Sequence, residues 1–182
     1  MSAEFVPPSD FKANSGEKGA APEWYVRAHL DAFMEIYNDW GFNSPIRSFA
    51  SPCGARNNLQ DGRMTGILKE YGLFDNSWFY AFDAPTIKYL KTKYNARTMG
   101  YPDFQMKRFD HTEGYRYYDE IGLSMSIVKS EVCPIFTSKG LPIHMYCADT
   151  EEDVKLCIEK GASLITANNP VPLMDVLKQQ DK

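Results

Sequence analysis

A glycine- and asparagine-rich loop is the first segment whose residue types could do chemistry. Residues 52–58 read PCGARNN, and the backbone N–H groups of such a loop, together with the guanidinium of Arg56, could hold an anion. The segment lacks the G-x-x-x-x-G-K-[ST] and G-x-G-x-x-G patterns of nucleotide-binding loops. An ordinary loop between a strand and a helix is therefore the simpler interpretation, and Arg56 is a candidate ligand-binding residue.

The three histidines are few for a chain that would rely on His-based acid/base chemistry. His144 lies inside a predicted strand, which favours a core or helix-facing position over a catalytic one. His111 lies in a polar and aromatic connection, where a metal site is the alternative to a solvated loop. The carboxylates that could complete such a site are Asp110, Glu113, Asp119 and Glu120.

The four cysteines do not have the spacing of a metal site. They are Cys53, Cys133, Cys147 and Cys157, with no C-x-x-C pair among them. Zinc sites use short paired spacings. We therefore expect ordinary reduced thiols and no metal ligands among these residues.

The charge balance argues against a long positive surface. The 182 residues include 20 Lys+Arg and 24 Asp+Glu, with a formal net charge of −4 and no Lys/Arg-rich run. We expect no nucleic-acid partner, because nothing would neutralise a phosphate backbone. No apolar run approaches the roughly 18–20 residues of a membrane-spanning helix, and residues 1–21 lack the apolar stretch of a signal peptide. These patterns predict a soluble protein of the cytoplasm or of an organelle interior, with no transmembrane segment.

Strand-like and helix-like segments alternate along the chain from residue 22 onward. A helical period runs from Trp24 to Trp40 and stops at Gly41. The predicted strands cover 46–51, 77–82, 96–100, 122–128, 142–146 and 163–166. The further predicted helices cover 62–71, 85–94, 131–138, 151–160 and 173–178. This alternation, with strands that are apolar on both sides, predicts an α/β fold with a mostly parallel sheet and covering helices.

The first 21 residues differ in composition from the rest of the chain. They are rich in Pro, Gly, Ser, Lys and Ala, and their large apolar residues are Phe5, Val6 and Phe11. Such a segment cannot pack alone, so we expect residues 1–21 to form an arm that is either flexible or laid across a partner. Residues 22–182 are expected to form a single domain that is long enough to bury its own core.

The C-terminal part of the chain carries a series of motifs. Residues 140–170 read GLPIHMYCADTEEDVKLCIEKGASLITANNP. A strand ends there in the turn YCAD, a helix begins with acidic residues and stops at Lys-Gly, and a final strand reads ITANNP. This series resembles the last two strand–helix units of the glycerophosphodiester phosphodiesterase family, whose fold is a TIM-like barrel.

Two upstream segments resemble the same family in the expected order. AFD at 81–83 is similar to the family's Ser-Phe-Asp strand end, and TMGY at 98–101 is similar to the strand that follows. The resemblance places Phe82, Tyr101 and Tyr146 at or just beyond strand ends, which is where barrels of this class build their sites. With Arg56, these three aromatic residues are the candidate ligand-binding residues.

The resemblance covers only the later part of a barrel. An eight-stranded barrel usually needs about 250 residues, and this chain has five or six predicted strands. We therefore expect an incomplete TIM-like barrel of five or six mostly parallel strands with helices outside. The first three strands of the family would have no counterpart.

This incompleteness bears on the chemistry that the resemblance implies. The family's His-Arg pair, Glu-x-Asp metal motif and His general acid follow its first three strands, and none has a counterpart here. Its fourth strand carries Glu-x-Lys, whereas the matching segment at 46–50 reads IRSFA. The family would use Ca²⁺ or Mg²⁺, so losing the ligands removes the cation as well. We expect no catalytic residues, no metal and no cofactor in this chain.

Two functions remain open from the sequence. The first is a degenerate, non-catalytic structural or interaction subunit whose open barrel edge is covered by another protein chain, because uncovered sheet edges promote aggregation. The alternative is a metal-dependent glycerophosphodiester phosphodiesterase that is active only when another polypeptide supplies the missing half.

Overall fold

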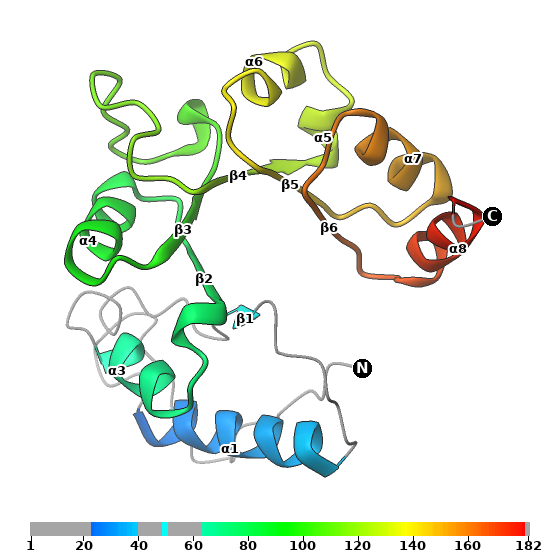
Figure 1. Ribbon diagram of the computed structural model, residues 1–182. Coiled ribbons are helices and arrows are strands. Elements are labelled where there is room, and N and C mark those ends of the chain that lie inside the picture. The colour runs from blue at the N-terminus through cyan, green and yellow to red at the C-terminus, as the bar shows by residue number, and fades with distance from the viewer. Residues whose placement is uncertain (1–22, 40–48, 51–62, 181–182) are drawn as a thin grey trace. The chain divides into compact units, whose positions relative to one another are not determined.

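The computed structural model describes residues 23–39, 49–50 and 63–180 (Figure 1). The chain forms two compact units. The N-terminal unit comprises Met1–Phe79 and Tyr89–Arg97, and the C-terminal unit comprises Tyr80–Lys88 and Thr98–Lys182. The predicted arm at 1–21 lies outside the described residues, and the expected single domain over 22–182 stays a prediction. No helix in the described part of the chain is long and apolar enough to cross a membrane.

The N-terminal unit packs helices against a short parallel strand pair. Its elements are α1 (Glu23–Asp39), β1 (Phe49–Ala50), α3 (Arg63–Glu70), a 3₁₀ turn (Phe74–Asn76), most of β2 (Ser77–Tyr80) and the second half of α4 (Ala84–Tyr94). β1 and β2 pair in parallel. The buried core consists of Val26, Leu30, Ile67, Leu68, Leu73, Phe79, Leu90 and Ala96.

The C-terminal unit contains four parallel strands in sequential order. Its main elements are β3 (Arg97–Gly100), β4 (Glu120–Ser124), α5 (Met125–Val128), α6 (Cys133–Thr137), β5 (Ile143–Tyr146), α7 (Glu151–Glu159), β6 (Leu164–Thr166) and α8 (Val171–Gln180). A 3₁₀ turn, η2 (Asp103–Gln105), follows β3. β4 pairs with β3 and β5, and β5 pairs with β6, all in parallel. These parallel strands with flanking helices confirm the predicted α/β class, an incomplete TIM-like barrel.

Alternate residues of these strands face two different environments, because side chains along a strand point to opposite sides. One side packs against the helices in a buried cluster that includes Ile121, Leu123, Ile143, Met145, Phe136, Val154 and Val176. The register places the intervening residues on the other side, which we call the inner face: Met99, Glu120, Gly122, Ser124, His144, Tyr146, Leu164 and Thr166. The functional question therefore concerns the inner face and the strand ends.

The capping residues behave as the sequence predicts. The Thr150 hydroxyl accepts a hydrogen bond from the Asp153 backbone N–H and begins α7, and three acidic residues lie in its first turn. Gly161 ends that helix with a φ of +78°, in the left-handed region that glycine adopts without strain.

One predicted element is partly wrong. The sequence predicts a strand over 122–128, but β4 covers Glu120–Ser124 and Met125–Val128 forms α5. The Lys129 N–H donates to the Met125 carbonyl at 3.0 Å and closes a helical turn. A short continuous apolar run has the same pattern in a buried strand as in a buried helix, so periodicity could not place this boundary. Of the predicted strand at 46–51, only Phe49–Ala50 lies within the described residues.

Candidate functional site

The structure brings together three of the four candidate ligand-binding residues. The rings of Phe82 and Tyr101 stack with centroids 3.9 Å apart and an interplanar angle of 7°. Tyr146 meets Tyr101 edge to face, with centroids 6.1 Å apart. Phe82 is 49% exposed, whereas Tyr101 is only 5% exposed. The three rings form a continuous aromatic wall at or just beyond the ends of β2, β3 and β5. The fourth candidate, Arg56, lies outside the described residues.

A glycine in β4 makes room for this wall. A Cβ atom at Gly122 would lie 3.0 Å from Cε1 of Tyr101 and 3.3 Å from the sulfur of Met99. The ring of Tyr101 therefore lies close to the backbone of β4 at Gly122. Burial raises the pKa of Tyr101, with smaller contributions from the nearby Tyr146 and Tyr80. The phenol of Tyr101 therefore stays protonated at neutral pH.

The backbone around Phe82 is held by the long connection between β3 and β4. The Lys107 N–H donates to the Phe82 carbonyl at 2.7 Å, and the Lys107 carbonyl accepts from the Ala84 N–H at 3.0 Å. These two bonds extend the parallel pairing past the end of β2, as an isolated bridge between Asp83 and Lys107. The position of the Phe82 ring thus depends on a loop about 25 residues away in the chain.

Asp83 is a buried carboxylate that accepts hydrogen bonds from Arg108 and Thr86. Arg108 donates to it through Nη2 at 2.6 Å and 2.8 Å and through Nε at 3.0 Å, and the Thr86 hydroxyl donates at 2.7 Å. Burial acts to raise the pKa of Asp83, but the hydrogen bonds from Arg108 and Thr86 outweigh it and hold the pKa below its usual value. Arg108 itself has a φ of +56°, which is uncommon for a residue with a side chain.

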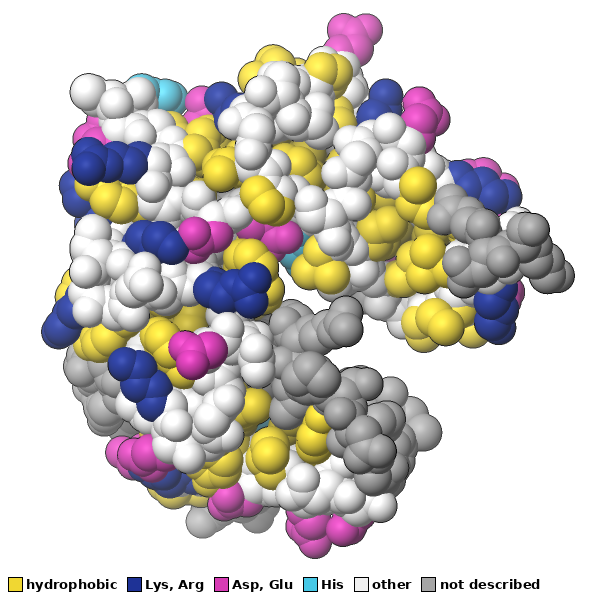
Figure 2. All heavy atoms as spheres, viewed as in Figure 1, with side chains coloured by type: hydrophobic (Ala, Val, Ile, Leu, Met, Phe, Trp, Pro, Cys, Tyr) yellow, Lys and Arg dark blue, Asp and Glu magenta, His cyan; other side chains and the backbone are white. Residues whose placement is uncertain are grey.

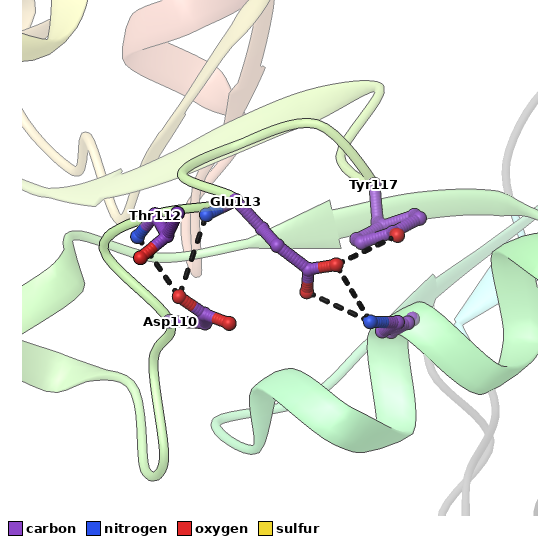
Figure 3. Close-up of polar contacts among 5 residues, drawn as sticks. Asp110, Thr112, Glu113 and Tyr117 are labelled. Atoms are coloured by element: carbon purple, nitrogen blue, oxygen red, sulfur yellow. Dashed lines mark hydrogen bonds and ion pairs between the residues drawn. The ribbon is translucent and has the colours of Figure 1, made fainter.

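A second set of contacts fastens the same connection to α4 (Figure 3). Lys88 donates to the two carboxylate oxygens of Glu113 at 2.7 Å and 2.8 Å, and the Tyr117 hydroxyl donates to Glu113 at 3.0 Å. Asp110 accepts from the backbone N–H groups of Thr112 and Glu113 at 2.8 Å and 3.4 Å. The hydrogen bond from Lys88 is the main cause that lowers the pKa of Glu113. These carboxylates fold the loop and bind it to the helix.

The alternative metal site around His111 is not formed by these contacts. Asp110 accepts hydrogen bonds within the loop, and Glu113 is bound by Lys88 and Tyr117. The side chain of His111 is 78% exposed, and its Nδ1 lies 3.7 Å from a carboxylate oxygen of Asp103. Within the described part of the chain, no group of three or more His, Cys, Asp or Glu side chains is placed to hold a metal ion.

His144 contacts its neighbours on the inner face. Its Nε2 lies 3.0 Å from the Thr166 hydroxyl, its Nδ1 lies 3.2 Å from the sulfur of Met99, and its ring meets Tyr146 edge to face. Burial lowers its pKa, which favours the neutral imidazole. Of the two sequence interpretations, the packed histidine fits these contacts, although it faces away from the helices. Thr166 was not a candidate from the sequence, and its place emerges only from the register of β5 with β6.

Asp149 joins the turns that follow β5 and β6. Its carboxylate accepts from the backbone N–H of Asn168 at 2.6 Å, from the Asn168 side-chain amide at 2.8 Å and from the Asn169 N–H at 3.3 Å. The hydrogen bond from the Asn168 side-chain amide is the main cause that lowers the pKa of Asp149. The two asparagines thus shape the turn that follows β6.

The comparisons with known proteins agree on the fold. No family profile and no curated protein matches the chain. Among solved structures, a glycerophosphodiester phosphodiesterase from Parabacteroides distasonis is similar over 74% of this chain, with a TM-score of 0.55 and 10% identity. A structure assigned to the same enzymes from Galdieria sulphuraria covers 82% of this chain, with a TM-score of 0.56 and 16% identity. One from Silicibacter pomeroyi covers 64%, with a TM-score of 0.51 and 13% identity.

The match covers only part of those proteins. This chain spans 56%, 63% and 42% of the three solved chains, respectively. The incomplete set of strands and this partial coverage agree with each other. The structure of the chain therefore has the fold of the glycerophosphodiester phosphodiesterases, over part of their barrel.

Proposed function

We propose that this chain is a glycerophosphodiester phosphodiesterase-like domain that works as a non-catalytic interaction subunit of a larger assembly. The observation that carries the proposal is the scarcity of carboxylates on the inner face of the described strands. Most side chains of this face and of the aromatic wall are aromatic, hydroxyl or imidazole groups: Phe82, Tyr101, Ser124, His144, Tyr146 and Thr166. The carboxylate on this face of the described strands is Glu120, at the start of β4 and 2% exposed. A hard divalent cation needs several oxygen ligands, chiefly carboxylates, and a single buried glutamate does not supply such a set.

The carboxylates nearest to the strand ends also support a structural role. Asp83 is neutralised by Arg108, and Asp149 is bound by Asn168. A carboxylate that already accepts two or three short hydrogen bonds has few lone pairs left for a metal or a proton transfer. The hydrogen bonds of both carboxylates therefore stabilise the loops next to the aromatic wall.

A second candidate function is a phosphodiesterase completed by another polypeptide. Two observations favour it. The similar solved structures are described as glycerophosphodiester phosphodiesterases, and this chain spans at most 63% of the length of the three compared. In that case the aromatic wall would line one side of a shared site, and the metal ligands would come from the other polypeptide.

A direct assay tests the proposal. The purified full chain is incubated with glycerophosphoethanolamine and Ca²⁺ or Mg²⁺, and released glycerol phosphate is measured. We expect no turnover above the buffer blank. Metal-dependent turnover that EDTA removes, and that Tyr146→Ala lowers, would overturn the non-catalytic function. Turnover that Tyr146→Ala leaves unchanged indicates a contaminating enzyme, and the proposal then stands.

A second measurement separates the two candidates. The same assay is repeated after adding the part of the Parabacteroides distasonis chain that this chain does not cover. Turnover that needs both polypeptides would support the completed enzyme and refute the non-catalytic subunit. A complex without turnover supports the interaction subunit.

A further inference from the structure

Helix α8 carries an apolar stripe that the described residues leave uncovered. Val171, Met174 and Leu177 are 59%, 50% and 41% exposed. They recur every three residues, so they share one side of the helix. The other side packs Val176 and Leu173 into the buried cluster of the C-terminal unit. Figure 2 shows hydrophobic side chains, in yellow, gathered around the C-terminal end of the chain.

Strand β6 precedes this helix in the chain, and one of its edges is unpaired among the described strands. It pairs in parallel with β5 through Leu164, Ile165 and Thr166, and no other described strand pairs with it. Ile165 packs against the same buried cluster as α8. Both elements therefore pack on one buried cluster, and we call the open edge of β6 together with the stripe of α8 the β6/α8 surface.

The chemistry of the β6/α8 surface specifies what could cover it. A parallel strand edge presents backbone donors and acceptors that another strand can satisfy. An apolar helix stripe beside it needs a second helix with its own apolar side. A strand followed by a helix supplies both at once, and this is the repeating unit of the parallel sheet seen here.

The comparisons point to the same occupant. The similar solved chains are longer, because this chain spans no more than 63% of any of the three. A barrel of this class closes when its last strand pairs with its first. The β6/α8 surface belongs to the last described strand–helix unit, so in a closed barrel of this class its edge would meet the first strand of the barrel.

We propose that the β6/α8 surface binds a strand–helix unit of a separate protein chain, whose strand adds in parallel to β6 and whose helix packs on Val171, Met174 and Leu177. This inference rests on the proposed interaction function and names its surface. The apolar stripe supplies the affinity, and the strand edge sets the register.

A binding experiment tests the surface. The full chain is titrated with the part of the Parabacteroides distasonis chain that it does not cover, and the dissociation constant is measured by calorimetry. Met174→Glu is expected to weaken binding by about tenfold or more, because it places a charge in an apolar contact. Gln179→Glu adds the same charge to the same helix about 140° away and is expected to leave binding unchanged within about twofold.

A second readout guards against a partner fragment that does not fold alone. The fragment is fused through a flexible Gly/Ser linker to the N-terminus of the full chain. Hydrogen exchange at Leu164, Ile165 and Thr166, and oxidation of the Met174 thioether by peroxide, are then compared with the unfused chain. The exchange rate and the oxidation rate are both expected to be at least tenfold lower in the fusion than in the unfused chain. Unchanged rates at both positions in a folded fusion would overturn the proposal.

The outcomes separate this inference from the proposed function. Binding that both glutamate variants leave intact would overturn the β6/α8 surface while the interaction function stands. Loss of binding in Gln179→Glu as well as Met174→Glu, with unchanged circular dichroism, would also overturn it, since the stripe would then not be specific. Turnover by the full chain alone would refute the proposed function, but it would not change what the binding measurements say about the β6/α8 surface.

Discussion

The ring of Tyr118 occupies the space where a side chain at Gly100 would lie. A Cβ atom built on Gly100, at the end of β3, would be 1.9 Å from Cε1 and 2.2 Å from Cδ1 of Tyr118. Tyr118 ends the long connection that leads into β4, and it is 6% exposed. This contact lets the connection return closely over β3.

We predict that Gly100→Ala lowers the free energy of unfolding by about 3 kcal/mol, because a buried ring and the backbone of a strand must move to admit the methyl group. Urea denaturation measures the change. Gly66→Ala is the matched control: nothing lies within 4 Å of a Cβ at Gly66, which is inside α3, so this substitution should stabilise by about 0.5–1 kcal/mol. Equal effects of the two substitutions would contradict the prediction.

The hydroxyl group of Tyr118 supplies a second prediction. It is buried, and no described residue lies within hydrogen-bonding distance of it. Burial raises its pKa to about 12, so the hydroxyl stays protonated at neutral pH. Tyr118→Phe keeps the ring over Gly100 and removes an unsatisfied polar atom. We expect it to raise the unfolding free energy by about 1 kcal/mol, and a loss of 1 kcal/mol in thermal or urea unfolding would refute the idea.

The two ion pairs of the long connection should contribute very differently. Asp83 has a side chain that is only 4% exposed, and Arg108→Ala leaves that carboxylate short of donors. We expect a loss of about 1–3 kcal/mol. Lys88 and Glu113 are 47% and 27% exposed, so Lys88→Ala should cost less than about 1 kcal/mol and the loss should shrink in high salt. Urea denaturation at two salt concentrations compares them, and a larger loss in Lys88→Ala would contradict this ranking.

His144 should make the stability depend on pH. Burial lowers the pKa of His144 in the folded state, while its pKa in the unfolded chain is about 6.5. Between these two pKa values the unfolded chain binds more protons, so this contribution is fully present above about pH 6.5 and is lost as the pH falls toward the folded-state pKa. Unfolding free energies from pH 8 to 5 measure the slope.

The matched variants for this slope are His144→Gln and His111→Gln. Gln can still meet the Thr166 hydroxyl but does not titrate, so His144→Gln should flatten the pH profile. His111 has a side chain that is 78% exposed, and its replacement should keep the profile of the parent chain. A profile that keeps its slope in His144→Gln would show that another group is responsible.

Local patterns determined the type and order of most elements. Helical periodicity located α1 and α7, and apolar runs bounded by turn residues located β2, β3, β5 and β6 close to their observed limits. Cap residues such as Thr150 marked helix ends, because they act on backbone groups a few residues away. The end of the strand predicted at 122–128 was wrong, because the residues that lead to Val128 include no Gly or Pro where β4 ends and α5 begins.

The site depended on contacts between distant parts of the chain. Sequence motifs placed Phe82, Tyr101 and Tyr146 at or beyond strand ends, and that much follows from the alternation of strands and helices. That these rings touch, that Gly122 makes room for Tyr101, and that Thr166 meets His144 follow from the register of neighbouring strands. Register is set by the packing of whole strands on their helices, which a one-dimensional pattern does not contain. The sequence alone thus determined which residues reach the strand ends, whereas the tertiary structure decided which of them meet.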